Sequence, residues 1–333
     1  MKKSNILPIL TIAMLLMTGL LWTAPVQAAK PKLNKSSINL HIEQGYSLKI
    51  KGLDKKLTVK WSVRNKKIAT VSLKGVVKGN SSGKTVVYAK VYNKNKLKYT
   101  LKANVKVDNK GYATTQALLV ALLKNKKVND IVVNGKAKFT IPKGNFGKNL
   151  ESVGDGLSLK VSEGSSLNSV IITGSKAVKI EVAGQLSYLY ARKDNAKISL
   201  KSSGKKAIVH TVFLENPAKL DFVSDSKKEP CNIYVLAKSD IKISGKNKKK
   251  DVVAINDSAE ETKVTANKSI TLFADARTTL VVNSGAKDSK ITSLDYKTPI
   301  TVTNNTGASL LVSTPSGKKT VEAGKTHTVT GKN

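Results

Sequence analysis

Short apolar pairs with one residue between their members recur from residue 131 to residue 312, about every 10 residues. A period of two is typical of strands that bury one face, and the intervening Gly, Asn, Asp, Ser and Lys residues favour turns. Strands this short and regular predict a solenoid whose stacked coils bury two or three side chains per strand. The pairs are Ile131/Val133, Phe139/Ile141, Leu157/Leu159, Val170/Ile172, Val178/Ile180, Ile198/Leu200, Val212/Leu214, Leu220/Phe222, Ile233/Val235, Ile241/Ile243, Ile270/Leu272, Leu280/Val282, Ile300/Val302 and Leu310/Val312.

The spacing of these pairs fits coils of about 20 to 30 residues, with two or three strands in each coil. The rhythm resembles that of right-handed parallel β-helix surface proteins, although no fixed motif accompanies it. Two further β-sandwiches of about 100 residues each are the alternative fold for this part of the chain.

One amphipathic helix is predicted before the first strand of this series. Thr114 or Thr115 is a candidate N-cap for a helix over Gln116–Lys124, and its leucines follow one another at spacings of three and four. An open solenoid end exposes backbone groups and core, so we expect this helix to cap the N-terminal end of the solenoid.

Residues 30–107 also alternate between apolar and polar side chains, in about seven short runs separated by glycines. Seven short strands around one central tryptophan, Trp61, predict a small β-sandwich. The runs are 38–42, 46–50, 57–63, 68–71, 76–77, 85–91 and 98–107.

Four motifs in this region keep a fixed order: Trp61-Ser62, then Ile68-Ala69-Thr70-Val71-Ser72, Gly75-Val76-Val77-Lys78-Gly79 and Gly83-Lys84-Thr85-Val86-Val87-Tyr88-Ala89. In this order they resemble the bacterial immunoglobulin-like group 2 family over residues 33–107. The resemblance implies an Ig-like module of bacterial surface and secreted proteins. Such modules are usually spacers or adhesive units without catalytic residues of their own.

The segment 1–28 has the pattern of a signal peptide. Two lysines precede an apolar run over residues 6–22, and Val26-Gln27-Ala28 is a small-x-small cleavage site. An uncleaved membrane anchor is the alternative. Residues 326–333 carry neither a hydrophobic tail nor a sorting signal. We therefore expect a secreted chain without a transmembrane segment after cleavage, held at a cell wall or cell surface by noncovalent forces.

The predicted organisation has four parts: a signal peptide at 1–28, an Ig-like β-sandwich at 30–107, a linker at 108–113 and a β-helix-like domain at 114–331. The chain carries a net charge of +36. Residues 30–107 hold 20 basic residues against Glu43 and Asp54, whereas residues 108–333 hold 36 basic against 20 acidic residues.

Nearly all of the basic residues are lysines, which favours diffuse attraction to polyanions over bidentate recognition. Export and the aromatic content of 5% argue against specific nucleic-acid binding. Anionic cell-wall polymers or acidic glycans are the predicted partners, with another surface protein as a further candidate. A low-GC genome that encodes lysine at solvated positions is the alternative origin of the composition.

The sequence points to no catalytic, cofactor-binding or metal-binding residue. The acidic residues of the second domain are dispersed, the three histidines lack ligand spacing, and Cys231 is expected to be a small buried residue. We therefore predict a secreted, surface-associated structural or adhesive protein with a lysine-rich Ig-like module, and no enzyme. The alternative is a carbohydrate-active β-helix enzyme, a polysaccharide lyase or hydrolase, with an Ig-like accessory module.

Overall fold

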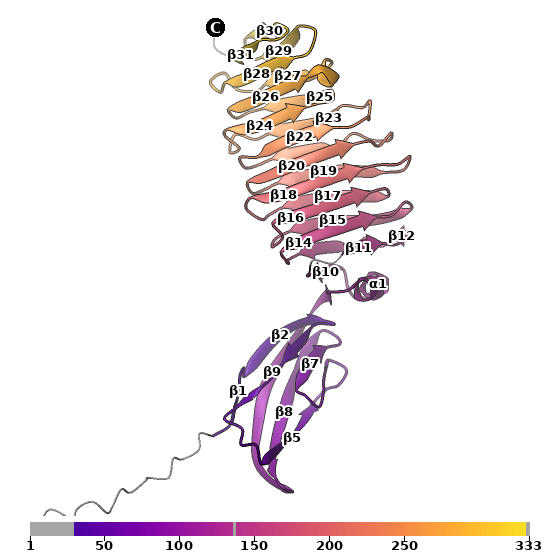
Figure 1. The fold of residues 1–333 in the computed structure, drawn as a ribbon, viewed down its shortest axis with the longest axis vertical. Coiled ribbons are helices and arrows are strands. Elements are labelled where there is room, and N and C mark those ends of the chain that lie inside the picture. Colours follow the sequence, from indigo (N-terminus) through magenta and orange to yellow (C-terminus); the bar gives the residue numbers. More distant parts are fainter. Residues whose placement is uncertain (1–29, 136–137, 331–333) are drawn as a thin grey trace, which may run out of the picture.

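The computed structural model describes residues 30–135 and 138–330 and is an all-β structure. The predicted signal peptide lies outside the described residues. Within the described ranges, no helix has the length and apolar character needed to span a membrane. Figure 1 shows an elongated molecule with the N-terminal region at one end and a stack of coils at the other.

The N-terminal region contributes to two main sheets. Strands β3, β7 and β6 form an antiparallel three-stranded sheet, whereas β5, β8, β9 and β2 belong to the largest sheet of the molecule. Leu40, Val77 and Val105, from both sheets, are buried in the core. The strands are β1 (Lys32–Leu33), β2 (Ser37–Ile42), β3 (Gly45–Ser47), β4 (Ile50–Lys51), β5 (Leu57–Val63), β6 (Ala69–Val71), β7 (Val76–Gly79), β8 (Gly83–Asn93) and β9 (Lys96–Ala113).

Residues 108–113, predicted to form a linker, are instead the end of strand β9. Gly111, Tyr112 and Ala113 continue the ladder and pair with the first solenoid strand, β10. The absence of a side chain at Gly111 has a steric role. A Cβ at this position would lie 2.7 Å from Cδ2 of Leu122, so glycine allows the following helix to pack against β9.

Helix α1 spans Gln116–Lys124, as predicted. Thr115 is the N-cap, and its Oγ1 accepts a hydrogen bond from the backbone N–H of Leu118 at 3.3 Å. Leu119, Leu122 and Leu123 are buried, and the helix contacts β9, β10 and β11 beside the first coil.

The rest of the chain is a β-solenoid of about 10 turns, over residues 111–313. Each coil contributes one strand to the sixteen-stranded sheet and one to the ten-stranded sheet, and successive coils pair in parallel (Figure 1). Every residue of the predicted apolar pairs is buried. Parallel pairing between coils rules out the alternative of two further antiparallel sandwiches.

The solenoid strands are short. Those of the sixteen-stranded sheet are β10 (Asp130–Val133), β12 (Gly144–Asn145), β13 (Asn149–Ser152), β15 (Ser165–Ile172), β17 (Gln185–Ala191), β19 (Ile208–Leu214), β21 (Asn232–Val235), β23 (Asp251–Ile255), β25 (Ile270–Ala274), β27 (Lys290–Ser293), β29 (Leu310–Thr314) and β30 (Gly317–Val321). Those of the ten-stranded sheet are β11 (Lys138–Ile141), β14 (Gly156–Val161), β16 (Ala177–Val182), β18 (Ala196–Ser202), β20 (Ala218–Ser224), β22 (Asp240–Ser244), β24 (Thr262–Ala266), β26 (Thr278–Asn283), β28 (Ile300–Asn305) and β31 (Thr326–Val329).

Coil length varies along the stack. Val170 pairs with Leu189, and Leu189 in turn pairs with Val212, so the second of these coils is longer than the first. A short 3₁₀ helix, η1 (Ser284–Ala286), lies in one of the later turns. At the C-terminal end, β30 and β31 pair antiparallel with β29 and β28 and so end the two sheets.

Candidate functional site: three solenoid and Ig-like surfaces

The outer face of the N-terminal sheet carries lysines directly opposite one another. Lys60 on β5 pairs with Lys90 on β8, and Lys84 on β8 pairs with Lys106 on β9. All four side chains are exposed. Like charges opposite each other on neighbouring strands destabilise a sheet. We call this surface, defined by these four lysines together with Arg64, the basic face.

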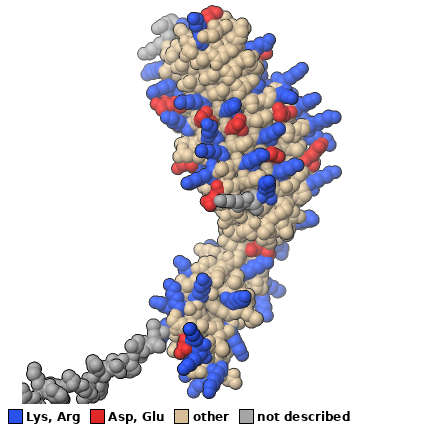
Figure 2. Space-filling view, in the orientation of Figure 1, with Lys and Arg blue, Asp and Glu red and all other residues tan. Residues whose placement is uncertain are grey.

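A hollow of about 440 Å³ opens on the basic face, and no acidic residue is among those that line it. Nη2 of Arg64 donates a hydrogen bond to the Tyr88 hydroxyl at 3.1 Å, which orients the guanidinium. In Figure 2, acidic atoms are sparse on the N-terminal region but are interspersed with basic atoms along the solenoid. The lining residues are Ser37, Asn39, Arg64, Lys84, Thr85, Val86, Asn104, Val105 and Lys106.

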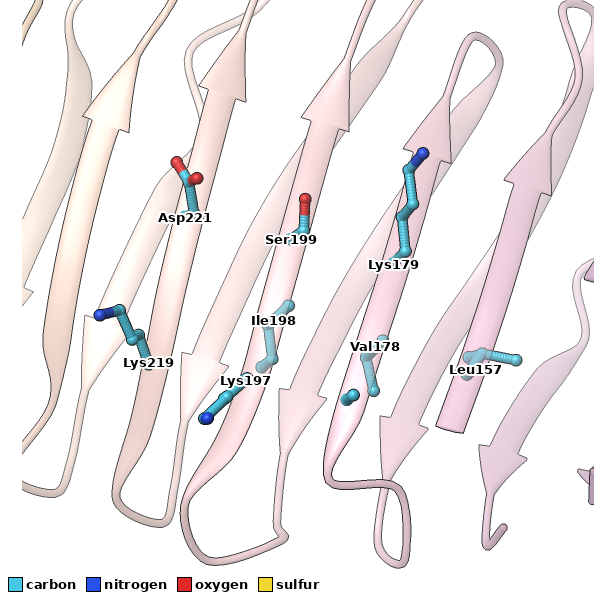
Figure 3. A pocket seen from close by; sticks show the side chains of 9 residues that line it. Leu157, Val178, Lys179, Lys197, Ile198, Ser199, Lys219 and Asp221 are labelled. Atoms are coloured by element: carbon cyan, nitrogen blue, oxygen red, sulfur yellow. The ribbon is translucent and has the colours of Figure 1, made fainter. Parts of the chain in front are cut away.

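A second hollow, of about 500 Å³, lies on the outer face of the ten-stranded sheet (Figure 3). It forms where the small side chains Ala177 and Ser199 stand between longer ones. Lys197 and Lys219 pair on neighbouring strands at one side, and Asp221 pairs with Ser199. Asp221 is the one acidic residue among those lining this hollow.

The outer face of the sixteen-stranded sheet carries a row of aromatic rings. Tyr190, Phe213 and Tyr234 occupy the same register position on β17, β19 and β21. The centroids of Tyr190 and Phe213 are 5.1 Å apart with an interplanar angle of 7°, and those of Phe213 and Tyr234 are 5.2 Å apart at 16°. Tyr188 lies beside Tyr190, with centroids 6.0 Å apart. Phe273 occupies the same register position on β25. We call Tyr190, Phe213, Tyr234 and Phe273 the aromatic ladder.

An ion pair flanks the aromatic ladder. Nε of Arg192 donates to Glu215 Oε2 at 2.6 Å, and Cζ of Arg192 lies 5.0 Å from the centroid of the Tyr190 ring. The hydrogen bond to Glu215 raises the pKa of Arg192 above its ordinary value. The guanidinium therefore contacts a ring and a carboxylate at once, an arrangement that favours arginine over lysine.

Several of the dispersed acidic residues of the solenoid lie beside basic residues in the described ranges. Asp251 is buried with Lys268, Asp225 and Asp240 lie near lysines, and Glu260 and Glu261 both lie near Arg277. No group of three or more His, Cys, Asp or Glu side chains is arranged to hold a metal ion in the part of the chain that the structure describes.

The histidines and the cysteine lie apart. His41 pairs with Asp108 at 2.9 Å, His210 is exposed on β19, and His327 is on β31. Cys231 is buried, as predicted, and burial raises the pKa of its thiol well above the ordinary value. Trp61, the central tryptophan of the predicted sandwich, is partly buried against the core.

Comparison with known proteins supports the motif-based assignment of the N-terminal region. Residues 42–101 match the family model of the bacterial Ig-like domain (group 2). The chain therefore contains a bacterial Ig-like domain followed by a β-solenoid. A search of curated proteins returned no match for the chain.

The sequence patterns predict neither the aromatic ladder nor the pairing of lysines on the basic face. Both depend on which residues of different strands stand opposite one another. Part of the ladder has a sequence signal, because Phe213 and Tyr234 occupy the central outward positions of the predicted pairs Val212/Leu214 and Ile233/Val235. Tyr190 has no such signal, because it lies in a strand that was not predicted.

Proposed function

We propose that the protein is a secreted, surface-associated binding protein whose Ig-like domain attaches to anionic cell-wall polymers through the basic face. The observation that carries this proposal is the direct opposition of Lys60 to Lys90 and of Lys84 to Lys106. Among the described residues, none of these ammonium groups has an acidic partner within ion-pair distance. A bound polyanion relieves the repulsion between them, so binding and stability are coupled.

The hollow on the basic face gives this attraction a local site. Arg64, Lys84 and Lys106 border it, and polar side chains complete its lining. A phosphate or carboxylate of a linear polymer in the hollow would contact donors from three strands. Charges along the rest of the face attract neighbouring anionic groups over about 10 Å at moderate salt.

The remainder of the molecule then serves as a projecting element. We infer that the two N-terminal sheets form an Ig-like sandwich and that α1 covers the N-terminal end of the solenoid. The buried leucines of α1 and its contacts with β9, β10 and β11 support that capping role. The solenoid hollow bordered by Lys197 and Lys219 offers a second, weaker site for an anion because Asp221 also lines it.

The test is binding of residues 30–333 to purified cell walls with and without teichoic acids, over a salt series that shortens the Debye length from about 10 to about 3 Å. A Lys84→Gln, Lys90→Gln, Lys106→Gln variant should bind about tenfold more weakly if each lost charge removes about 0.5 kcal/mol. The matched control changes the exposed solenoid lysines Lys160, Lys242 and Lys290 to Gln.

Loss of binding in the basic-face variant but not in the control supports attachment through the Ig-like domain. Equal losses in both variants show that only total charge matters, and unchanged binding after removal of teichoic acids contradicts a polyanionic wall ligand. Mass spectrometry of the exported protein tests secretion, with an N-terminus at Ala29 as the expected result.

A further inference from the structure

The aromatic ladder is interrupted at one rung. Ala254 on β23 pairs with Tyr234 on one side and with Phe273 on the other. Neighbouring strands lie about 4.8 Å apart, so side chains two strands apart are separated by about 9.6 Å. Rings that stack need centroid spacings of about 4.5–7 Å. The space above Ala254 therefore has the width for one planar group in contact with both rings.

Both walls of this gap are open to solvent. Tyr234 is 41% exposed and Phe273 is 37% exposed. One face of the Tyr234 ring is occupied by Phe213, at an interplanar angle of 16°, so its other face is directed along the stack toward the Ala254 rung.

A carboxylate lies beside the gap. Asp275 follows β25 two positions after Phe273 and so projects from the same face of the sheet. Within the described ranges, its side chain forms no hydrogen bond or ion pair. Residues diagonal to each other on neighbouring strands lie about 7–8 Å apart, within reach of a long side chain. Asp275 is thus placed to accept hydrogen bonds from a group held above Ala254.

The same face already displays the arrangement that would fill this gap. Arg192 lies against the Tyr190 ring and donates to Glu215. At the gap, the rings of Tyr234 and Phe273 correspond to the Tyr190 ring, and the carboxylate of Asp275 corresponds to that of Glu215. The group that corresponds to the guanidinium is missing there. We propose that the gap above Ala254 receives the guanidinium of an arginine from a partner protein, stacked between the two rings with Asp275 as its counter-ion.

The occupant is assigned to a different protein because this chain's own arginines are engaged. The sequence contains three arginines. Arg64 bonds to Tyr88, Arg192 to Glu215, and Arg277 lies near two glutamates. A chain with a net charge of +36 repels a basic partner, so the arginine is expected within a neutral or acidic segment. This inference does not depend on the proposed attachment to anionic polymers, which uses a different face.

The probe is a capped peptide, Glu-Gly-Arg-Gly-Glu, added to residues 30–333 labelled with ¹³C at alanine methyl groups. We expect a saturable shift of the Ala254 methyl resonance, identified from its loss in Ala254→Ser. Peptides with lysine or citrulline in place of arginine should bind at least about fivefold more weakly, because lysine lacks the planar group and citrulline lacks the charge.

Binding of the peptides to variants of the protein is measured by saturation-transfer NMR, observed on the peptide resonances. Ala254→Phe should abolish binding because a fourth stacked ring fills the gap. Thr292→Phe is the matched control, since Thr292 pairs with Phe273 on its other side and leaves the gap open. Asp275→Asn should weaken binding of the arginine peptide severalfold and reduce its advantage over the citrulline peptide.

Four results would overturn the proposal. They are equal binding of the three peptides, undiminished binding to Ala254→Phe, absence of binding by any peptide, and a shift of the Ala254 methyl produced by a neutral oligosaccharide but not by the arginine peptide. Dimerisation of the chain that is lost in Arg277→Gln would overturn the assignment to a different protein and point to a second copy of the chain instead.

Discussion

Nζ of Lys268 lies 2.7 Å from Oδ2 of Asp251 inside the solenoid, and the two side chains are only 6% and 0% exposed. The other carboxylate oxygen of Asp251 accepts a hydrogen bond from the backbone N–H of Cys231 at 2.9 Å. Lys268 also donates to the backbone carbonyl of Lys249. These bonds join three successive coils, so the pair is a buried ionic connection between neighbouring coils.

Removing one member of this pair should destabilise the solenoid strongly. We expect Lys268→Met to lower the free energy of unfolding by about 3–5 kcal/mol, because Asp251 is left as an uncompensated buried charge. Urea denaturation followed by circular dichroism measures the change. Lys268→Met combined with Asp251→Asn removes the charge but keeps an acceptor for Cys231, and should recover part of the loss. A double variant as unstable as the single one would contradict this account.

The Cys231 thiol should be unreactive in the folded protein. Burial raises its pKa, and the nearby Asp251 carboxylate raises it further. A raised pKa means that less thiolate is present at pH 8 than in an unfolded chain, and only the thiolate attacks disulfide reagents. The rate of reaction with an aromatic disulfide, in buffer and in guanidinium chloride, checks this. Equal rates in the two solutions would show that the thiol is accessible.

Reversing one charge on the basic face should stabilise the protein while weakening polymer binding. Lys90→Glu places a negative charge directly opposite Lys60, and we expect the free energy of unfolding to rise by about 0.5–1 kcal/mol. Thermal unfolding and cell-wall binding are measured on the same preparation. Lys290→Glu makes the same change of charge opposite a threonine and should alter neither property as much. Destabilisation by Lys90→Glu would show that the opposed lysines carry no repulsion.

Loss of the N-cap should loosen α1 without unfolding the solenoid. Thr115→Ala removes the acceptor for the Leu118 N–H and should cost about 1 kcal/mol locally. Amide hydrogen exchange in residues 116–124 should accelerate, whereas Thr114→Ala serves as the control. Equal acceleration by the two substitutions would place the cap elsewhere.

The inward-facing residues of the strands are predictable from the sequence because they follow a local pattern, the alternation of apolar and polar residues. Every predicted apolar pair is buried in a strand. Four other solenoid strands were missed because their second inward residue is small, and small residues do not stand out against turn sequences. Such inward residues are Ser152 in β13, Ala191 in β17, Ala266 in β24 and Ser293 in β27. Strand β23 was also missed, although its inward residues Val253 and Ile255 are both large.

The outward surfaces are less predictable because they depend on register between coils of unequal length. The stretch of chain from Tyr190 to Phe213 is longer than the stretch from Phe213 to Tyr234, yet all three rings share one register position. A fixed repeat would have misplaced them. The lysines of the basic face present the same difficulty, since their opposition appears only when β5, β8 and β9 are aligned.

Strand β9 has a mechanical consequence. It pairs with β8 through the Ig-like region and then with β10 of the first coil, without an interruption of the strand. A load applied to the far end of the solenoid while the Ig-like domain is anchored therefore passes through a continuous backbone ladder rather than a slack tether. The continuous strand therefore makes the joint stiff and fixes the direction of the solenoid relative to the Ig-like domain.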